Sequence, residues 1–151
     1  PTQAQGLIPS IEQLVSRYRQ QTGAMVFFQN ELHGAQLPAD VEIQVARIVQ
    51  EALNNAQKHS QAETVRVLLR REPQGQFNVL VEDDGYGIAA HQEPAGPGER
   101  VGLKIMQERA ERIQGELKIE SEPGEGTRVW LSFRRPQEEQ PLMPTPLLKR
   151  A

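Results

Sequence analysis

The chain has 151 residues, of which 37% are hydrophobic, and this content is enough to bury the core of one domain but not of two. The 17 basic and 20 acidic residues give a formal net charge of −3, so the sequence lacks the broad positive field typical of nucleic-acid-binding proteins. The absence of cysteine excludes disulfides and thiolate zinc sites, and no apolar run approaches the roughly 20 residues that span a bilayer.

The chain begins at Pro1 without an initiator methionine, which suggests a piece of a longer protein. Its first pattern is helical and ends at Thr22-Gly23. The apolar residues at helical spacing are Ile8, Ile11, Leu14, Val15 and Tyr18. The segment 24–30 is short and rich in β-formers, which predicts a strand. His33, in the loop that follows, is interpreted as a solvated surface residue.

Residues 40–60 form the strongest pattern of the chain and predict a helix with Asp40 as its N-cap. Apolar residues gather on one side of this helix and polar residues on the other. Glu51, Asn55 and Lys58 stand at i, i+4 and i+7, which places an acid, an amide and an ammonium within two turns. Such a set suits a metal-bound phosphate ligand, although polar residues at this spacing are more often a solvated helix face.

Residues 64–70 and 77–81 alternate as strands, joined by a hairpin loop at 73–75. Counting by twos from Phe77 places Asp83 on the apolar face of the second strand. Gly85 and Gly87 follow, and glycines allow the backbone to approach a flat ligand closely. Asp-Asp-Gly is also a common turn, so this motif alone is weak evidence for a site.

Residues 89–101 contain prolines and glycines without periodicity and are predicted to form a loop that acts as a lid. A second helix is expected to begin at Gly102 and to end with Gly115 as its C-cap. Its buried stripe would consist of Leu103, Met106, Ala110 and Ile113. The N–H groups at a helix start favour phosphate, so Gly102 is a candidate anion site.

Residues 116–120 and 127–133 read as two more strands, joined by a hairpin at 122–126. Alternation turns Thr127 toward the packed side, where its hydroxyl can serve a site or bond to backbone. Residues 136–151 are proline-rich and predict a disordered tail after a domain of residues 1–135. The order of elements predicts a two-layer α/β (α+β) sandwich, with helices on one face of a mostly antiparallel mixed sheet.

Four segments occur together in one order: EALNNAQKH, DDGYG, VGLKIM and GEGT. Together, over about residues 40–133, they closely resemble the N box and the three glycine boxes of the GHKL superfamily, which includes histidine kinases, DNA gyrase B, Hsp90 and MutL. The finer pattern resembles sensor histidine kinases of the nitrate/nitrite-sensor (NarX/NarQ-like) type. The resemblance implies the Bergerat ATP-binding fold and the catalytic, ATP-binding (HATPase) domain of a two-component sensor kinase.

The resemblance also implies roles for single residues. Asn55 would hold Mg²⁺ between the phosphates of ATP, Glu51 would be the general base or water-orienting carboxylate, and Lys58 would contact phosphate. Asp83 would accept from the adenine amino group, and Thr127 would reach that carboxylate through water. The other nucleotide-binding positions would be Gly85, Gly87, Ile88, Gly102 and Leu103.

One departure limits the resemblance. The second glycine box carries Glu-Arg-Val where relatives often carry Gly-His-Gly, so Arg100 is either a substitute phosphate ligand or an exposed residue. His59 falls beside the apolar side of its helix and is interpreted as a packed or helix-terminal residue. It is not a phosphoacceptor candidate, because the resemblance places the acceptor on an upstream dimerisation helix. His91 is interpreted as an exposed loop residue.

The expected function is therefore transfer of the γ-phosphoryl group of Mg-ATP to a histidine on a dimerisation domain outside this chain, for relay to a NarL-like response regulator. The resemblance further implies a cytoplasmic domain, a homodimeric full-length protein anchored in the bacterial inner membrane, and no contact with nucleic acid. Two alternatives stay open: a GHKL ATPase in which Glu51 activates water, and a catalytically inactive nucleotide-sensing interaction module.

Overall fold

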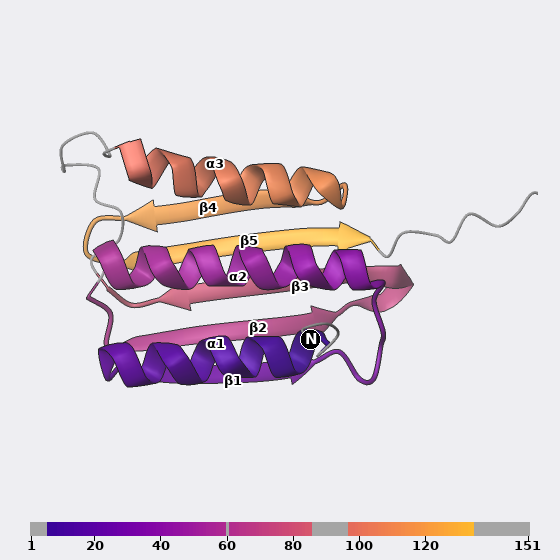
Figure 1. Cartoon of the computed structure of the whole chain (residues 1–151), viewed down its shortest axis with the longest axis horizontal. Coiled ribbons are helices and arrows are strands. Elements are labelled where there is room, and N and C mark those ends of the chain that lie inside the picture. Colours follow the sequence, from indigo (N-terminus) through magenta and orange to yellow (C-terminus); the bar gives the residue numbers. More distant parts are fainter. Residues whose placement is uncertain (1–5, 60, 86–96, 135–151) are drawn as a thin grey trace, which may run out of the picture.

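The computed structural model describes residues 6–59, 61–85 and 97–134. Three helices lie side by side across one face of a five-stranded sheet (Figure 1). The helices are α1 (Leu7–Thr22), α2 (Ala39–His59) and α3 (Pro97–Arg112). The strands are β1 (Met25–Glu31), β2 (Thr64–Arg71), β3 (Gln76–Asp83), β4 (Glu116–Glu122) and β5 (Gly126–Arg134). The predicted two-layer sandwich is confirmed.

The strands follow the order β1-β2-β3-β5-β4 across the sheet. β1 pairs with β2 in parallel, because the chain crosses over through α2 between them, and the other three pairings are antiparallel. β2 and β3 are joined by a short turn at Pro73–Gly75, where the hairpin loop was expected. The sheet is thus mixed and mostly antiparallel, as predicted.

Helix α2 turns its apolar side to the sheet and forms the middle of the core. Its buried residues are Val41, Val45, Ile48, Val49, Ala52, Leu53 and Ala56. The prediction of Asp40 as N-cap is wrong, since the helix begins at Ala39 and the Glu42 N–H donates to the Pro38 carbonyl at 3.0 Å. Asp40 lies in the first turn instead, where its negative charge is favourable to the helix dipole.

Helix α3 begins at Pro97, five residues before the predicted start at Gly102. Proline suits the first helical position because its ring presets φ and the missing N–H has no partner there. Residues 97–101, expected to belong to the loop, are therefore helical. The rest of the expected lid, residues 89–96, lies outside the described residues.

The end of α3 also differs from the prediction. The residue with positive φ is Gln114, at 56°, and not Gly115. The Gly115 N–H donates to Ala110 O at 2.8 Å and the Gln114 N–H to Glu111 O at 3.0 Å, which is a Schellman ending. Glycine is needed at position 115 for a steric reason, because an added Cβ would lie 2.9 Å from the carbonyl oxygen of Ser132.

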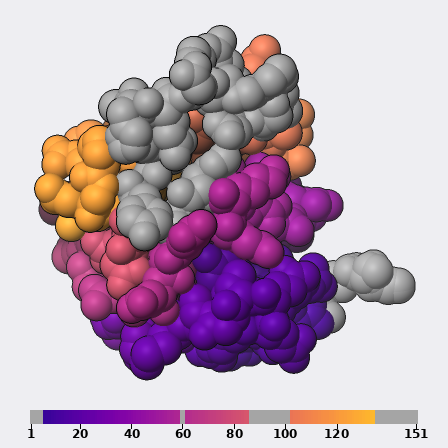
Figure 2. Space-filling model, turned by 90° about the vertical axis from the view of Figure 1, so that its left-hand side faces the viewer, coloured from indigo at the N-terminus to yellow at the C-terminus, as the bar shows by residue number. Residues whose placement is uncertain are grey.

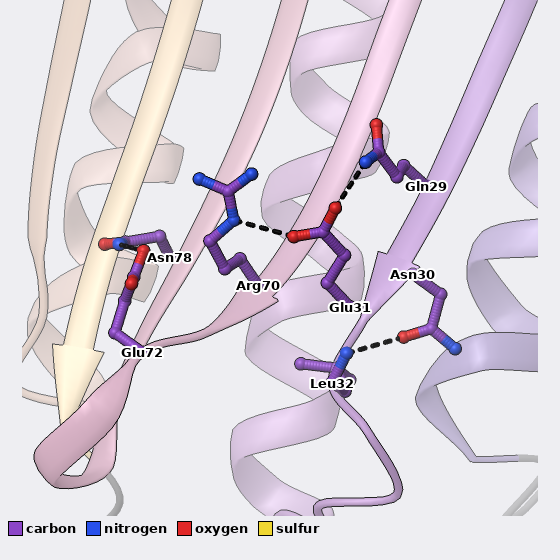
Figure 3. Close-up of polar contacts among 7 residues, drawn as sticks. All are labelled: Gln29, Asn30, Glu31, Leu32, Arg70, Glu72 and Asn78. Carbon is purple, nitrogen blue, oxygen red and sulfur yellow. Dashed lines mark hydrogen bonds and ion pairs between the residues drawn. The ribbon is translucent and has the colours of Figure 1, made fainter.

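The opposite face of the sheet carries polar and charged side chains. Figure 3 shows the Glu31–Arg70 ion pair at 2.8 Å and the Asn78 side chain donating to Glu72 at 2.9 Å. The hydrogen bond from Arg70 lowers the pKa of Glu31. These contacts belong to the end of β1 and β2 and the start of β3, away from Asp83, so they support the sheet and not the site.

Candidate functional site

The candidate residues meet at one end of the molecule. The C-terminal ends of α1 and α2, the last residues of β3 and the β4–β5 hairpin all lie on the left in Figure 1. Figure 2 looks onto this end, with α1 and β1 in indigo below, α2 in magenta and the β4–β5 hairpin in orange. Residues distant in the sequence are therefore neighbours here.

The polar face of α2 turns toward α3. An added Cβ at Gly102 would lie 3.0 Å from Oε1 of Glu51 and 3.6 Å from Oδ1 of Asn55. Further along the same face, the Arg109 guanidinium of α3 donates to Oε1 of Gln44 at 2.9 Å. Glu51 and Asn55 are half-buried in this contact, so the reading of a fully solvated helix face does not hold for them.

Lys58, one turn after Asn55, is exposed in the last turn of α2. Gly102 is buried inside α3, and its backbone N–H belongs to the second turn and not to the helix start. The prediction that Gly102 and Leu103 begin the helix is therefore wrong. In the structure Gly102 leaves room for the Glu51 carboxylate, while a Cβ there would only touch Asn55 at ordinary contact distance.

Asp83 and Thr127 form the floor of the site on the helix-covered face of the sheet. They face each other across β3 and β5, and Val65 and Ser121 continue the same cross-strand row on either side. Asp83 is 7% exposed and Thr127 is 9% exposed, the two buried polar side chains among the described residues. The prediction that both point inward is confirmed.

The backbone on both sides of Asp83 is closely packed around it, at Gly85 and at Gly126. Oδ1 of Asp83 accepts from the Gly85 N–H at 2.9 Å, which curls the chain around the acid at the end of β3. Gly126 lies against the same residue, and a Cβ there would fall 1.9 Å from the Asp83 carbonyl oxygen. Gly126 also has φ of 87°, so glycine is required on both counts.

Two residues near the floor were not found from the sequence. The Ser121 hydroxyl lies 3.1 Å from the Thr127 hydroxyl and orients it from β4. Tyr18 of α1 is buried, and its pKa is raised to about 12, first by burial and then by the negative charge of Asp83. Only the strand register and the packing of α1 bring these residues to the site, and no local pattern signals either.

Several expected positions lie outside the described residues: Gly87, Ile88 and His91, together with the side chain of Arg100. A polar pocket of about 540 Å³ opens near the β4–β5 hairpin and touches Asp83, Ser121 and Gly126. Its lining does not include Glu51, Asn55 or any other residue of α2, so it is a separate hollow and not the space between α2 and the floor.

The donors on α2 fit a magnesium ion that is carried mainly by a phosphate ligand. No cluster of three or more histidine or carboxylate side chains suited to a metal occurs in residues 6–59, 61–85 and 97–134. Mg²⁺ commonly takes one or two protein oxygens and completes its shell with water and phosphate oxygens. The Asn55 amide oxygen, beside the Glu51 carboxylate, supplies that kind of donor set.

Residues 40–137 match the family described as histidine kinase-, DNA gyrase B- and HSP90-like ATPase. The chain belongs to this family. The match begins in the first turn of α2 and takes in every candidate site residue, so the expectation from the four motifs is confirmed at the level of the family.

The curated relatives of this ATPase domain are sensor kinases. It is 35% identical over 134 residues to the signal transduction histidine-protein kinase/phosphatase DegS of Brevibacillus brevis, covering 89% of the chain and 34% of DegS. It is also 35% identical over 140 residues to the nitrate/nitrite sensor protein NarQ of Escherichia coli, covering 92% of the chain and 24% of NarQ. The chain thus spans about a third or less of these proteins, and the predicted relationship to histidine kinases is confirmed.

Solved structures support the fold. The blue-light activated histidine kinase EL346 of Erythrobacter litoralis matches with a TM-score of 0.73 at 22% identity, over 88% of this chain and 43% of that one. The mycobacterial sensor histidine kinase MprB matches with a TM-score of 0.69 at 21% identity, over 85% and 94%. At this identity the likeness concerns the fold of the ATPase domain.

Proposed function

We propose that this domain binds Mg-ATP between α2, α3 and the Asp83–Thr127 floor, and that it is the catalytic domain of a sensor histidine kinase. In the whole protein it would transfer the γ-phosphoryl group to a histidine on an upstream dimerisation domain. The observation that carries the proposal is the contact at Gly102. It places α3 against the Glu51 and Asn55 side chains, and α2 ends at the same end of the molecule as β3, whose last residue is the buried Asp83.

Each residue has a chemical task in this proposal. The Asp83 carboxylate accepts a hydrogen bond from the adenine amino group, which guanine does not offer at that position. Thr127 supports this carboxylate from across the β3–β5 pair. Asn55 offers an amide oxygen to the metal, and the exposed Lys58 ammonium is free to swing toward phosphate oxygens.

Catalysis of phosphoryl transfer depends mostly on positioning the reactants and neutralising the charge of the phosphate oxygens. Bound Mg²⁺ would supply positive charge to the phosphate oxygens as the phosphoryl group leaves. Glu51, half-buried beside Asn55, is placed to orient the attacking histidine or to take its proton. Glu51 acts on a group from another domain, so the isolated domain is expected to bind nucleotide without phosphorylating itself.

The proposed partners follow from the same assignment. They are the dimerisation domain of the same protein and a response regulator of the NarL-like type, and the full-length protein would be a homodimer anchored in the inner membrane. None of the helices in the described part of the chain is long and apolar enough to cross a membrane.

Calorimetry with a matched pair of asparagines tests the proposal. Asn55→Ala should weaken Mg-ATP binding by about tenfold or more, because it removes a metal-ligating oxygen. Without Mg²⁺, the affinities of Asn55→Ala and the unsubstituted domain should converge. Asn54→Ala is the control, since Asn54 is the exposed neighbour on the same helix and should bind like the unsubstituted domain.

The contrary outcomes are distinct. No Mg-dependent binding of ATP or ADP at millimolar nucleotide, together with a melting temperature that nucleotide does not change, would favour an inactive interaction module. Steady phosphate release by the domain alone would favour an ATPase in which Glu51 activates water. Equal affinities for Asn54→Ala and Asn55→Ala would remove the metal role of Asn55.

A further inference from the structure

Asp84, the second acid of the Asp83-Asp84 pair, makes a different set of contacts from Asp83. Its Oδ1 accepts from the backbone N–H groups of Glu63 and Thr64, both at 3.0 Å. Its own N–H donates to the Thr64 carbonyl at 3.2 Å. Three hydrogen bonds therefore tie the residue after β3 to the start of β2, which is 20 residues away in the sequence.

These bonds hold the connection through which the chain returns from α2 to the sheet. Gln61, in this connection, has φ of 49°, a left-handed conformation that is uncommon outside glycine. The next anchor is Glu63, whose carbonyl accepts from the Met25 N–H of β1 at 2.9 Å while its N–H bonds to Asp84. The connection is thus fastened to β1 on one side and to the end of β3 on the other.

We call the hydrogen bonds of Asp84 with Glu63 and Thr64 the Asp84 clamp. Its position in the fold relates it to nucleotide binding. Asn55 and Lys58 lie in the last two turns of α2, just before the clamped connection. Asp83, the residue proposed to contact adenine, immediately precedes Asp84. The residues proposed to contact the phosphates therefore precede Glu63 and Thr64, which Asp84 ties to the residue proposed to contact adenine.

We propose that Asp84 is a positioning residue for nucleotide binding, which fixes the end of α2 relative to Asp83 so that one nucleotide can reach both. This inference rests on the proposed function. Asp84 does not need to touch the ligand, and its side chain is exposed. One oxygen accepts both hydrogen bonds, so we expect an uncharged amide oxygen at this place to serve as well as the carboxylate.

Three variants separate positioning from charge and from general stability. Asp84→Ala removes the acceptor, whereas Asp84→Asn retains a side-chain oxygen with the same reach. Glu63→Ala removes one negative charge from the same connection and leaves its N–H group and the Asp84 acceptor in place. We expect the Kd of the domain for Mg-ATP, measured at about 15 °C, near the usual temperature of maximum stability, and after circular dichroism has verified folding, to rise about five- to tenfold in Asp84→Ala.

Asp84→Asn and Glu63→Ala should stay within about twofold of the unsubstituted domain. The preference for Mg-ATP over Mg-GTP should shrink in Asp84→Ala as well, because a displaced Asp83 no longer matches the base. Amide hydrogen exchange at Glu63 and Thr64 should be faster in Asp84→Ala alone, which reports directly on the clamp.

Each result bears on the proposal. If Asp84→Ala melts at a lower temperature but retains the Kd and the ATP preference, Asp84 has only a stabilising role and the proposal is wrong. A loss in Glu63→Ala equal to that in Asp84→Ala would assign the effect to charge and would also overturn it. If the unsubstituted domain does not bind Mg-ATP, the proposed function fails first, and that result is distinct because hydrogen exchange at Glu63 and Thr64 still reports on the clamp.

Discussion

At the scale of single residues, two neighbouring aspartates have different surroundings and different hydrogen-bond partners. Asp83 is buried and accepts from the Gly85 N–H. Asp84 is exposed and accepts from the backbone of the α2–β2 connection. Asp83 is the last residue of β3, whereas Asp84 follows the strand, where its side chain can reach the neighbouring connection. Substitutions at the two positions are accordingly expected to have different consequences.

Asp83→Asn is expected to weaken Mg-ATP binding by about ten- to a hundredfold, because an adenine amino group loses a charged acceptor. Mg-GTP binding should change much less, so the ratio of the two Kd values is the informative quantity. Competition calorimetry with both nucleotides measures it. Equal losses for ATP and GTP would mean that Asp83 shapes the site without reading the base.

At the scale of elements, the contact between α2 and α3 decides what the polar face of α2 can do. A solvated face would leave Glu51 and Asn55 free to adopt many rotamers. The packing of Gly102 beside them leaves these side chains less free than a solvated face would. A methyl group at Gly102 would crowd the Glu51 carboxylate in this contact.

Gly102→Ala tests that contact. Alanine is favoured over glycine in a helix interior by up to about 1 kcal/mol, so the melting temperature should rise or stay the same once the flexible Glu51 side chain moves away. The new Cβ, 3.0 Å from Oε1 of Glu51, should nevertheless displace that carboxylate and reduce phosphoryl transfer in the full-length protein. Autophosphorylation with labelled ATP, alongside thermal melting, distinguishes the two effects.

An unchanged transfer rate in Gly102→Ala would show that Glu51 tolerates displacement. Lys104→Ala is a suitable control, because Lys104 is exposed on the same helix. It should alter neither the melting temperature nor the rate by much.

At the scale of the whole molecule, α1 closes the core at the end that holds the site. Its buried residues Leu7, Ile11, Val15 and Tyr18 form one stripe against the sheet and α2. Arg19 donates to the Val26 carbonyl of β1 at 2.6 Å, which fastens the C-terminal part of the helix to the sheet. Burial of Tyr18 beside the charge of Asp83 then links global stability to pH.

The folded domain holds the Tyr18 proton more tightly than the unfolded chain, since its pKa is raised from 10.0 to about 12. Below pH 10 both states keep the proton and this contribution is constant. Between pH 10 and 12 the unfolded chain ionises first, so stability should fall by about 1.4 kcal/mol per pH unit from this group. Urea unfolding of the unsubstituted domain and Tyr18→Phe across this range measures the difference.

If Tyr18→Phe loses stability as steeply as the unsubstituted domain between pH 10 and 12, other groups cause the decline. The substitution keeps the buried ring, so its unfolding cooperativity should match that of the unsubstituted domain. A changed urea dependence would mean that the core itself had altered.

The local patterns of the chain were sufficient for the layers, the strands and the faces of several site residues. The period of two assigned Asp83 and Thr127 to the covered side of the sheet, and the helical period separated the core side of α2 from Glu51 and Asn55. Each of these follows from backbone geometry that any five to ten residues express by themselves.

The reason for Gly102 and the parts played by Ser121, Tyr18 and Asp84 needed the tertiary structure, whereas Pro97 is a local signal for the start of α3. Ser121 reaches Thr127 through strand register, Asp84 reaches Glu63 across 21 residues, and Gly102 matters because another helix lies against it. Hydrogen bonds and steric contacts between segments depend on distance in space, which a periodic pattern along one segment does not contain. The sequence alone therefore determined which face each residue would take, and the packing of the elements decided which residues would meet there.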